Sequence, residues 1–107
     1  MWDIVSKNEK VKEYAGWLSL ELANEPVRVR DASGNRPTDG TWGPANGPAK
    51  TDFFQPIINK IRSNGFTGVI WAPGSTWQQN YQSYRKKALN DSNLGYAVHF
   101  YPGWFQT

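Results

Sequence analysis

The chain has 107 residues, a length typical of one domain, and its 38% hydrophobic and 20% charged residues exclude a disordered polypeptide. Its 12 basic and 9 acidic residues leave a net charge of +3, which is too mild to indicate binding to nucleic acid. With 0 cysteines it holds no disulfide and no thiolate metal site, and no apolar run approaches the ~20 residues that span a membrane. Aromatic residues reach 15%, with 6 tryptophans, so flat apolar side chains either fill a core or line a ligand groove.

The first part of the chain predicts a helix followed by a strand. Residues 1–14 place apolar residues among charged ones, as in an amphipathic helix, and Gly16 ends it. In residues 17–26, leucines alternate with polar or small residues, which is the period of a strand. Pro26 ends this strand, because proline has no N–H to donate to a sheet.

A long connection and a second helix follow. Residues 27–50 are rich in Gly, Pro, Asn and Asp, and a loop longer than ~15 residues in a compact domain is usually functional or disordered. Thr51 or Asp52 is expected to cap a helix that ends before Gly65. Pro56 predicts a late start or a kink in the first turn. The apolar face of this helix is expected to comprise Phe53, Phe54, Ile57, Ile58 and Ile61.

The last part predicts a strand, a helix and a strand. Residues 67–72 form an apolar run that Pro73 stops. Residues 77–89 carry tyrosines on one side, which favours an amphipathic helix. Residues 94–101 predict a third strand, ended by Pro102.

This order of elements predicts part of a parallel sheet. Strands that alternate with helices are typical of α/β folds with right-handed crossovers. Ala72 and Tyr101 are 101 − 72 = 29 positions apart, close to the roughly 31 residues per unit of a (β/α)8 barrel. Three strands cannot close a barrel, and a parallel sheet is normally covered on both faces. Residues 1–107 are therefore interpreted as one segment of an incomplete α/β domain.

Polar side chains gather where the first and third predicted strands end. Asn24 and Glu25 end the first strand, and His99 and Tyr101 end the third. The carboxyl ends of parallel strands are where α/β proteins build their sites. Alternation places Glu25 on the face opposite the leucines and His99 on the face opposite Val98. These residues therefore predict a site at one edge of the sheet.

Structural roles are also open for the charged residues. Glu25 lies directly before a proline, so an exposed carboxylate in a turn is as good an interpretation as a site residue. Glu21 in mid-strand is expected to be buried and paired to an arginine. A lone histidine such as His99 is more often a hydrogen-bonded core residue than a catalyst. The basic run at 85–87 is expected to be a solvated helix face rather than a nucleic-acid site.

The tryptophans divide into two groups. Those expected in the core are Trp2, Trp17 and Trp71. In loops that follow strands, exposed indoles could stack on the apolar C–H faces of sugar rings. These candidates for substrate binding are Trp42, Trp77 and Trp104. No metal site is expected, because one histidine and no cysteine leave only scattered carboxylates.

Residues 20–26, LELANEP, resemble glycoside hydrolase family 5, the family of cellulases and endoglucanases. Three further segments match that family in the same order: 53–65 (FFQPIINKIRSNG), 69–74 (VIWAPG) and 95–102 (GYAVHFYP). The resemblance covers nearly the whole chain. It implies a partial (β/α)8 TIM barrel, from the end of the third helix through strands four, five and six.

The resemblance also implies roles for the residues at the strand ends. Glu25 looks like the acid/base carboxylic acid, and Asn24 looks like the neighbour that binds the 2-hydroxyl of the sugar being cleaved. His99 and Tyr101 look like the pair that lines that subsite. The implied substrate is β-1,4-linked glucan or a related polysaccharide, with no cofactor and no membrane partner. The implied parent enzyme is secreted, although the first residues, MWDIVSK, lack the pattern of a signal peptide.

A retaining glycosidase needs a second carboxylate ~5 Å from the first. The resemblance puts it on strand seven, and Asp52 and Asp91 do not substitute for it, because they lie near expected helix boundaries. We therefore expect the 107 residues alone to be inactive. We also expect self-association through open strand edges at 18–24 and 96–101.

The alternative function is a non-catalytic carbohydrate-binding module that uses the loop tryptophans. Modules of this size are usually β-sandwiches, and the two helical patterns argue against that fold. An interaction domain without a sugar ligand is disfavoured by the residues at the strand ends. The sequence does not choose among cellulose, xyloglucan, mannan and mixed-linkage glucan.

Overall fold

The computed structural model describes residues 1–26, 33–34, 49–79, 81–100 and 102. Trp42, Tyr101 and Trp104 lie outside the described residues. No helix in the described part is long and apolar enough to cross a membrane. In chain order the elements are α1 (Trp2–Lys7), α2 (Glu9–Glu13), β1 (Leu20–Glu21), α3 (Ala49–Ser63), β2 (Ile70–Pro73), α4 (Ser75–Gln78), α5 (Ser83–Lys86) and β3 (Leu94–Ala97).

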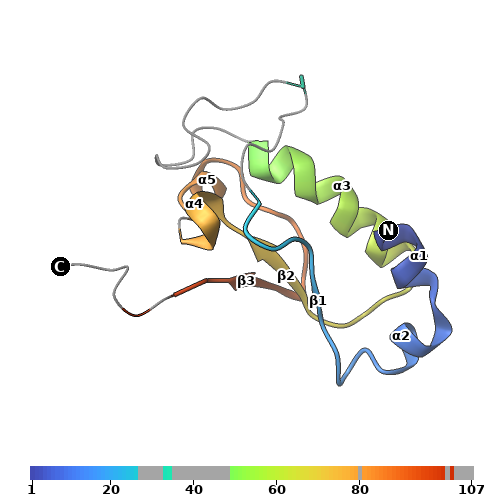
Figure 1. Cartoon of the computed structure of the whole chain (residues 1–107). Coiled ribbons are helices and arrows are strands. Elements are labelled where there is room, and N and C mark those ends of the chain that lie inside the picture. Colours follow the sequence, from blue (N-terminus) through green and yellow to red (C-terminus); the bar gives the residue numbers. More distant parts are fainter. Residues whose placement is uncertain (27–32, 35–48, 80, 101, 103–107) are drawn as a thin grey trace.

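The strands form a parallel sheet in the order β1-β2-β3, as the alternation of strands and helices predicts (Figure 1). Leu20 pairs with Ile70, and Ile70 pairs with Leu94. The ladder continues past β1, because the N–H of Leu22 donates to the carbonyl of Trp71. The three strands therefore run in the same direction and end at the same edge of the sheet.

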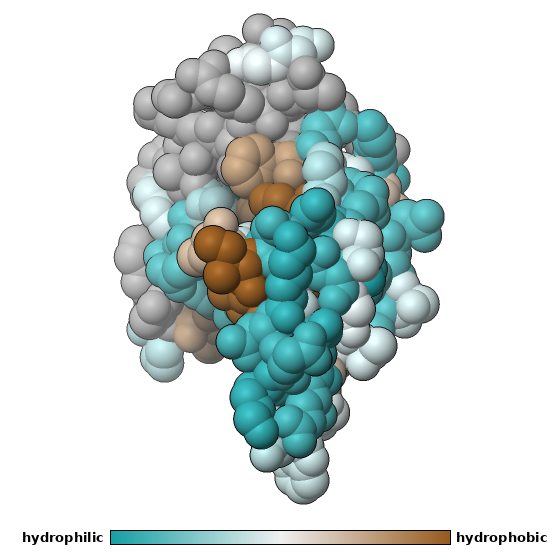
Figure 2. All heavy atoms as spheres, turned by 90° about the vertical axis from the view of Figure 1, so that its right-hand side faces the viewer, coloured by the Kyte–Doolittle hydropathy of each residue, from teal (hydrophilic) through white to brown (hydrophobic). Residues whose placement is uncertain are grey.

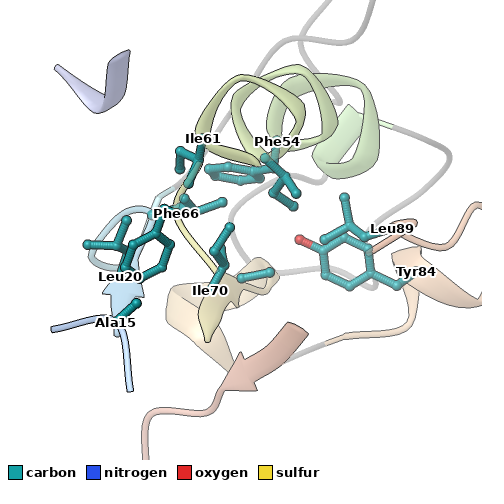
Figure 3. Close-up of a cluster of buried hydrophobic side chains, with 11 residues drawn as sticks. Ala15, Leu20, Phe54, Ile61, Phe66, Ile70, Tyr84 and Leu89 are labelled. Atoms are coloured by element: carbon teal, nitrogen blue, oxygen red, sulfur yellow. The ribbon is translucent and has the colours of Figure 1, made fainter. Parts of the chain in front are cut away.

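The core lies between the sheet and α3, which covers one face of it (Figures 1 and 3). Alternation directs Leu20 and Leu22 into this core, whereas Glu21 between them is exposed. From α3 come Phe54, Ile58 and Ile61, spaced to lie on one face of the helix. The other buried apolar residues are Ala15, Phe66, Ile70, Ala72, Tyr84 and Leu89.

Arg62 at the end of α3 holds the segments that lead into β2 and β3. Its guanidinium donates to both carboxylate oxygens of Asp91, at 2.9 and 2.8 Å. It also donates to the carbonyls of Phe66, Gly68 and Asn93. The Arg62 hydrogen bonds lower the pKa of the Asp91 carboxyl. The end of the sheet opposite the candidate site is thus fixed by one side chain.

The N-terminal helix and α3 differ in their limits from the prediction. Residues 1–14 form two short helices, because Asn8 is extended and its side chain accepts from the N–H groups of Lys10 and Val11. α3 begins at Ala49, before the expected cap, so the late start predicted from Pro56 is wrong. Thr51 does not cap the helix, because its hydroxyl donates to the carbonyl of Lys87. Gly65, with φ +96°, ends α3 as predicted.

The helix predicted over 77–89 is wrong in length. Trp77 and Gln78 have φ of 50° and 62°, and a right-handed helix cannot continue through left-handed residues. Two single turns, α4 and α5, stand in its place. The tyrosine pattern still reflects packing, because the rings of Tyr81 and Tyr84 both contact Tyr96 on β3.

Two tryptophans expected in the core lie elsewhere. Trp17 is 92% exposed, and Trp71 lies on the face of β2 opposite α3, where its indole N–H donates to the Ser19 hydroxyl. Trp2 does pack against the core, and its indole N–H donates to the carbonyl of Leu22. Seen from the side of α1 and α2, the surface is mostly hydrophilic, with a small apolar area (Figure 2).

Candidate functional site

Glu25 and His99, which are 74 residues apart in sequence, meet at the carboxyl edge of the sheet. Nδ1 of His99 lies 2.9 Å from Oε1 of Glu25. Both side chains are partly buried. The parallel strands account for this meeting, because Glu25 follows β1 and His99 follows β3. The structure thus brings together two of the residues that the sequence singled out.

Glu21 is a third member of this cluster. Its Oε1 lies 3.5 Å from Nε2 of His99, on the other side of the imidazole ring from Glu25. The prediction that Glu21 is buried and paired to an arginine is wrong, because its side chain is 42% exposed and its partners are His99 and Gln78. Its alternation with the core leucines turns it to the sheet face that α3 does not cover.

Gln78 in α4 is a fourth member of the cluster, and it was not among the residues predicted from the sequence. Its side chain is fully buried and binds Glu25, Glu21 and the carbonyl of Ala97. The predicted helix over 77–89 hid this residue, since it placed Gln78 in a regular first turn. The usable signal was its place in the segment that follows the strand predicted over 67–72, at the edge of the sheet where sites form.

The remaining site residues take different places. Asn24, next to Glu25, is exposed. Trp77 is half-buried in α4, next to Gln78. Tyr81 donates its hydroxyl to the carbonyl of Ala97, and burial raises the pKa of this phenol. Tyr101, Trp42 and Trp104 lie outside the described residues, so their predicted contacts with substrate stay predictions.

A buried lysine lies against the segment that follows Glu25. The Lys50 ammonium donates to the carbonyl of Pro26 at 2.9 Å. Burial lowers the pKa of this amine to about 8, because the charged form loses hydration. Lys50 thereby ties the start of α3 to the end of the β1 segment.

The arrangement suits proton chemistry on a ligand at the strand ends. Two carboxylates flank one imidazole, and their hydrogen-bond partners hold them at a common edge. Within the described ranges no group of three or more His, Cys, Asp or Glu residues could hold a metal ion. Among the described residues, grooves of about 450 and 350 Å³ lie along α3, and their lining residues do not include Glu25 or His99. The lining of the larger one includes Thr51, Asp52, Gln55, Asn59, Lys87 and Asn90.

Comparison with known proteins gives two findings. Residues 6–107 match the family model described as cellulase, glycosyl hydrolase family 5. Endoglucanase A of Evansella cellulosilytica is 26% identical over 110 residues, covering 95% of this chain. The match takes in 22% of that protein, so this chain spans about a fifth of the relative's length. No solved structure matches the chain significantly.

Proposed function

Because the chain belongs to glycosyl hydrolase family 5, we propose that it carries Glu25 as the general acid/base of a retaining endo-β-glycanase. The observation that carries this proposal is the contact between Glu25 and His99 at the carboxyl edge of a parallel sheet. The name of its relative, Endoglucanase A, supports glucan as the substrate class. We propose β-1,4-linked glucan or a related polysaccharide.

In the first step a second carboxylate, proposed to lie on a seventh strand, attacks the anomeric carbon while Glu25 donates its proton to the glycosidic oxygen. The glycosidic bond breaks, the leaving sugar departs as an alcohol, and a glycosyl ester with the second carboxylate forms. In the second step the Glu25 carboxylate takes a proton from the water that hydrolyses this ester and releases the sugar. His99 contacts Oε1 of Glu25 and so limits the rotation of the carboxyl group. Asn24 is proposed to bind the 2-hydroxyl of the sugar, and Tyr101 to line the same subsite with His99.

The three strands are proposed to be the fourth, fifth and sixth of a (β/α)8 barrel. Two observations support this: the sheet is parallel in chain order, and α3 covers only one of its faces. The open face, which carries Glu21 and Trp71, would then point into the barrel. The nucleophile is proposed to come from a seventh strand, so we expect no turnover by residues 1–107 alone. We further propose that the enzyme acts outside the cell, where β-glucans occur.

The test is to replace Glu25 by Gln in the full-length protein and measure hydrolysis of two substrates. One is soluble β-glucan, and the other is an aryl cellobioside with a good leaving group. Protonation of the leaving oxygen contributes ~10²–10⁴-fold, so we expect a loss of that order on glucan. The loss on bond cleavage in the aryl substrate should be much smaller, because its leaving group needs little protonation.

Glu13→Gln is the matched control, because Glu13 is an exposed residue of α2 that pairs only with Lys10 among the interactions described. This variant should keep the activity of the parent on both substrates. Equal losses on the two substrates for Glu25→Gln would refute the acid role. Hydrolysis of glucan by the 107-residue chain alone, abolished by Glu25→Gln, would refute the assignment of the nucleophile to another strand.

A further inference from the structure

Gln78 connects the β1 segment to the end of β3 through one buried amide. Its side chain is 0% exposed. Its Oε1 accepts a hydrogen bond from the backbone N–H of Glu25 at 2.5 Å. Its Nε2 donates to the carbonyl of Ala97 at 2.9 Å and to Oε1 of Glu21 at 3.1 Å. The amide is therefore satisfied on both sides, toward β1 and toward β3.

The donors and acceptors around Gln78 require an amide. Glu25 presents an N–H, which needs an acceptor, whereas Ala97 and Glu21 present oxygens, which need donors. An amide has one oxygen and one NH₂ group and meets both needs. A carboxylate of the same shape would meet only the first need, because its second oxygen would face the oxygens of Ala97 and Glu21 with no proton to donate.

The backbone conformations of Glu25 and Gln78 are strained, and the hydrogen bond between the two residues helps to hold them. Glu25 has φ of 47° and Gln78 has φ of 62°, in the left-handed region that is strained for non-glycine residues. Glu25 also precedes Pro26, which restricts its backbone further. The hydrogen bond from Glu25 N–H to Gln78 fixes the peptide from which the Glu25 carboxyl group extends.

His99 is held by the same residue. The backbone N–H of His99 donates to the backbone carbonyl of Gln78 at 2.9 Å. Both partners of the contact between Glu25 and His99 are thus bonded to Gln78, one through its side chain and one through its main chain.

We propose that Gln78 is a positioning residue for the reaction: it sets the orientation of the Glu25 carboxyl group relative to His99. This inference rests on the proposed acid/base role of Glu25. A misplacement of about 1 Å at a reacting group can cost ~10²-fold in rate. Gln78 should therefore affect the protonation step without contacting the substrate.

The main test is Gln78→Glu in the full-length protein, assayed on β-glucan and on an aryl cellobioside. We expect kcat on glucan to fall roughly 10–100-fold, with KM changed less than about threefold. The loss on the aryl substrate should be clearly smaller, as for Glu25→Gln. A loss of equal size on both substrates would overturn the positioning role.

Gln55→Glu is the matched control for a purely structural effect. Gln55 also bridges two segments, since it binds Asn59 within α3 and both the N–H and the carbonyl of Asn90. It lies in the larger groove along α3, away from Glu25. Its replacement should lower the melting temperature and leave kcat unchanged. If both glutamine variants lose kcat in proportion to their loss of stability, Gln78 has only a structural role.

A second measurement does not depend on a folded variant. Amide hydrogen exchange of the unmodified protein should show a protected N–H at Glu25, because this group is bonded to a buried oxygen. Exchange at Glu25 as fast as at exposed Ser92 would overturn the inference. Failure of the Glu25→Gln assay with a protected Glu25 amide would instead count against the proposed function.

Discussion

The indole of Trp71 on β2 lies directly over Gly95, its register partner on β3. A Cβ atom at Gly95 would come within 2.4 Å of two ring carbons of Trp71. No side chain fits there unless the ring moves, and the ring is also held by its hydrogen bond to Ser19. Gly95 is therefore explained by the packing of an aromatic ring on the open face of the sheet.

We expect Gly95→Ala to lower the free energy of unfolding by about 1–3 kcal/mol, because the added methyl group overpacks the contact with Trp71. Denaturation by urea, followed by circular dichroism, measures the change. Gly16→Ala is the control, because a Cβ at Gly16 meets nothing within 4 Å. Equal effects of the two substitutions would show that Trp71 moves aside freely.

The parallel sheet and the side-chain alternation along its first strand were predictable from the sequence. Strand periodicity and chain order gave the parallel sheet, and the alternation of leucines with polar residues placed Glu21 and Glu25 away from the core leucines. Those signals depend on the burial of one face, which the local sequence records.

Residues that depend on distant partners were not predictable. Trp17 and Trp71 are of a residue type that commonly fills a core, but both are exposed in the structure. The local sequence around Trp77 and Gln78 favours a regular helix. The left-handed backbone found there is held by hydrogen bonds from Gln78 to Glu25 and Ala97, which are distant in sequence, and no local pattern reveals these partners. Tertiary contacts override local propensity at such positions.

Lys50 predicts a dependence of stability on pH. The pKa of its amine is about 8 in the folded protein, below the ordinary 10.5, so the unfolded chain binds more protons between these values. The free energy of unfolding should therefore rise with pH across this window, relative to Lys50→Met, which has no amine to titrate. Urea denaturation of both proteins at about pH 7 and about pH 10 measures the difference.

Lys60→Met is the control for this measurement, because Lys60 is exposed on α3. Its stability should change with pH in parallel with that of the parent. A constant difference between the parent and Lys50→Met from pH 7 to 10 would contradict the burial of a charged amine.

Trp77→Ala tests the proposed stacking on sugar. We expect affinity for cello-oligosaccharides to fall by about tenfold, corresponding to the ~1.4 kcal/mol expected for loss of one aromatic contact. The melting temperature should change little, because Trp77 is only half-buried. Titration calorimetry with the full-length protein measures the affinity. A large fall in melting temperature with unchanged affinity would assign Trp77 to packing.

The exposed side of β3 predicts self-association of the 107-residue chain. β3 is an edge strand, and Val98, just beyond it, is 59% exposed. Unpaired strand edges with apolar side chains recruit other chains. We expect sedimentation velocity to show dimers or larger species at micromolar concentration, and Val98→Lys to shift the distribution toward monomer. A 107-residue chain without the Val98 substitution that sediments as a monomer at this concentration would refute this expectation.

The left-handed backbone at Glu25, Trp77 and Gln78 has a consequence for directed evolution. Glycine adopts these φ values without strain, so glycine at any of the three positions would relax the chain locally. A variant library selected for heat resistance alone should accumulate glycine at Glu25 and Trp77, but not at Gln78, whose buried amide hydrogen-bonds Glu25, Glu21 and Ala97. Such a selection would favour heat-resistant proteins that have lost side chains at the strand ends, the Glu25 carboxyl group among them. The survivors should therefore be screened for hydrolysis in the same round.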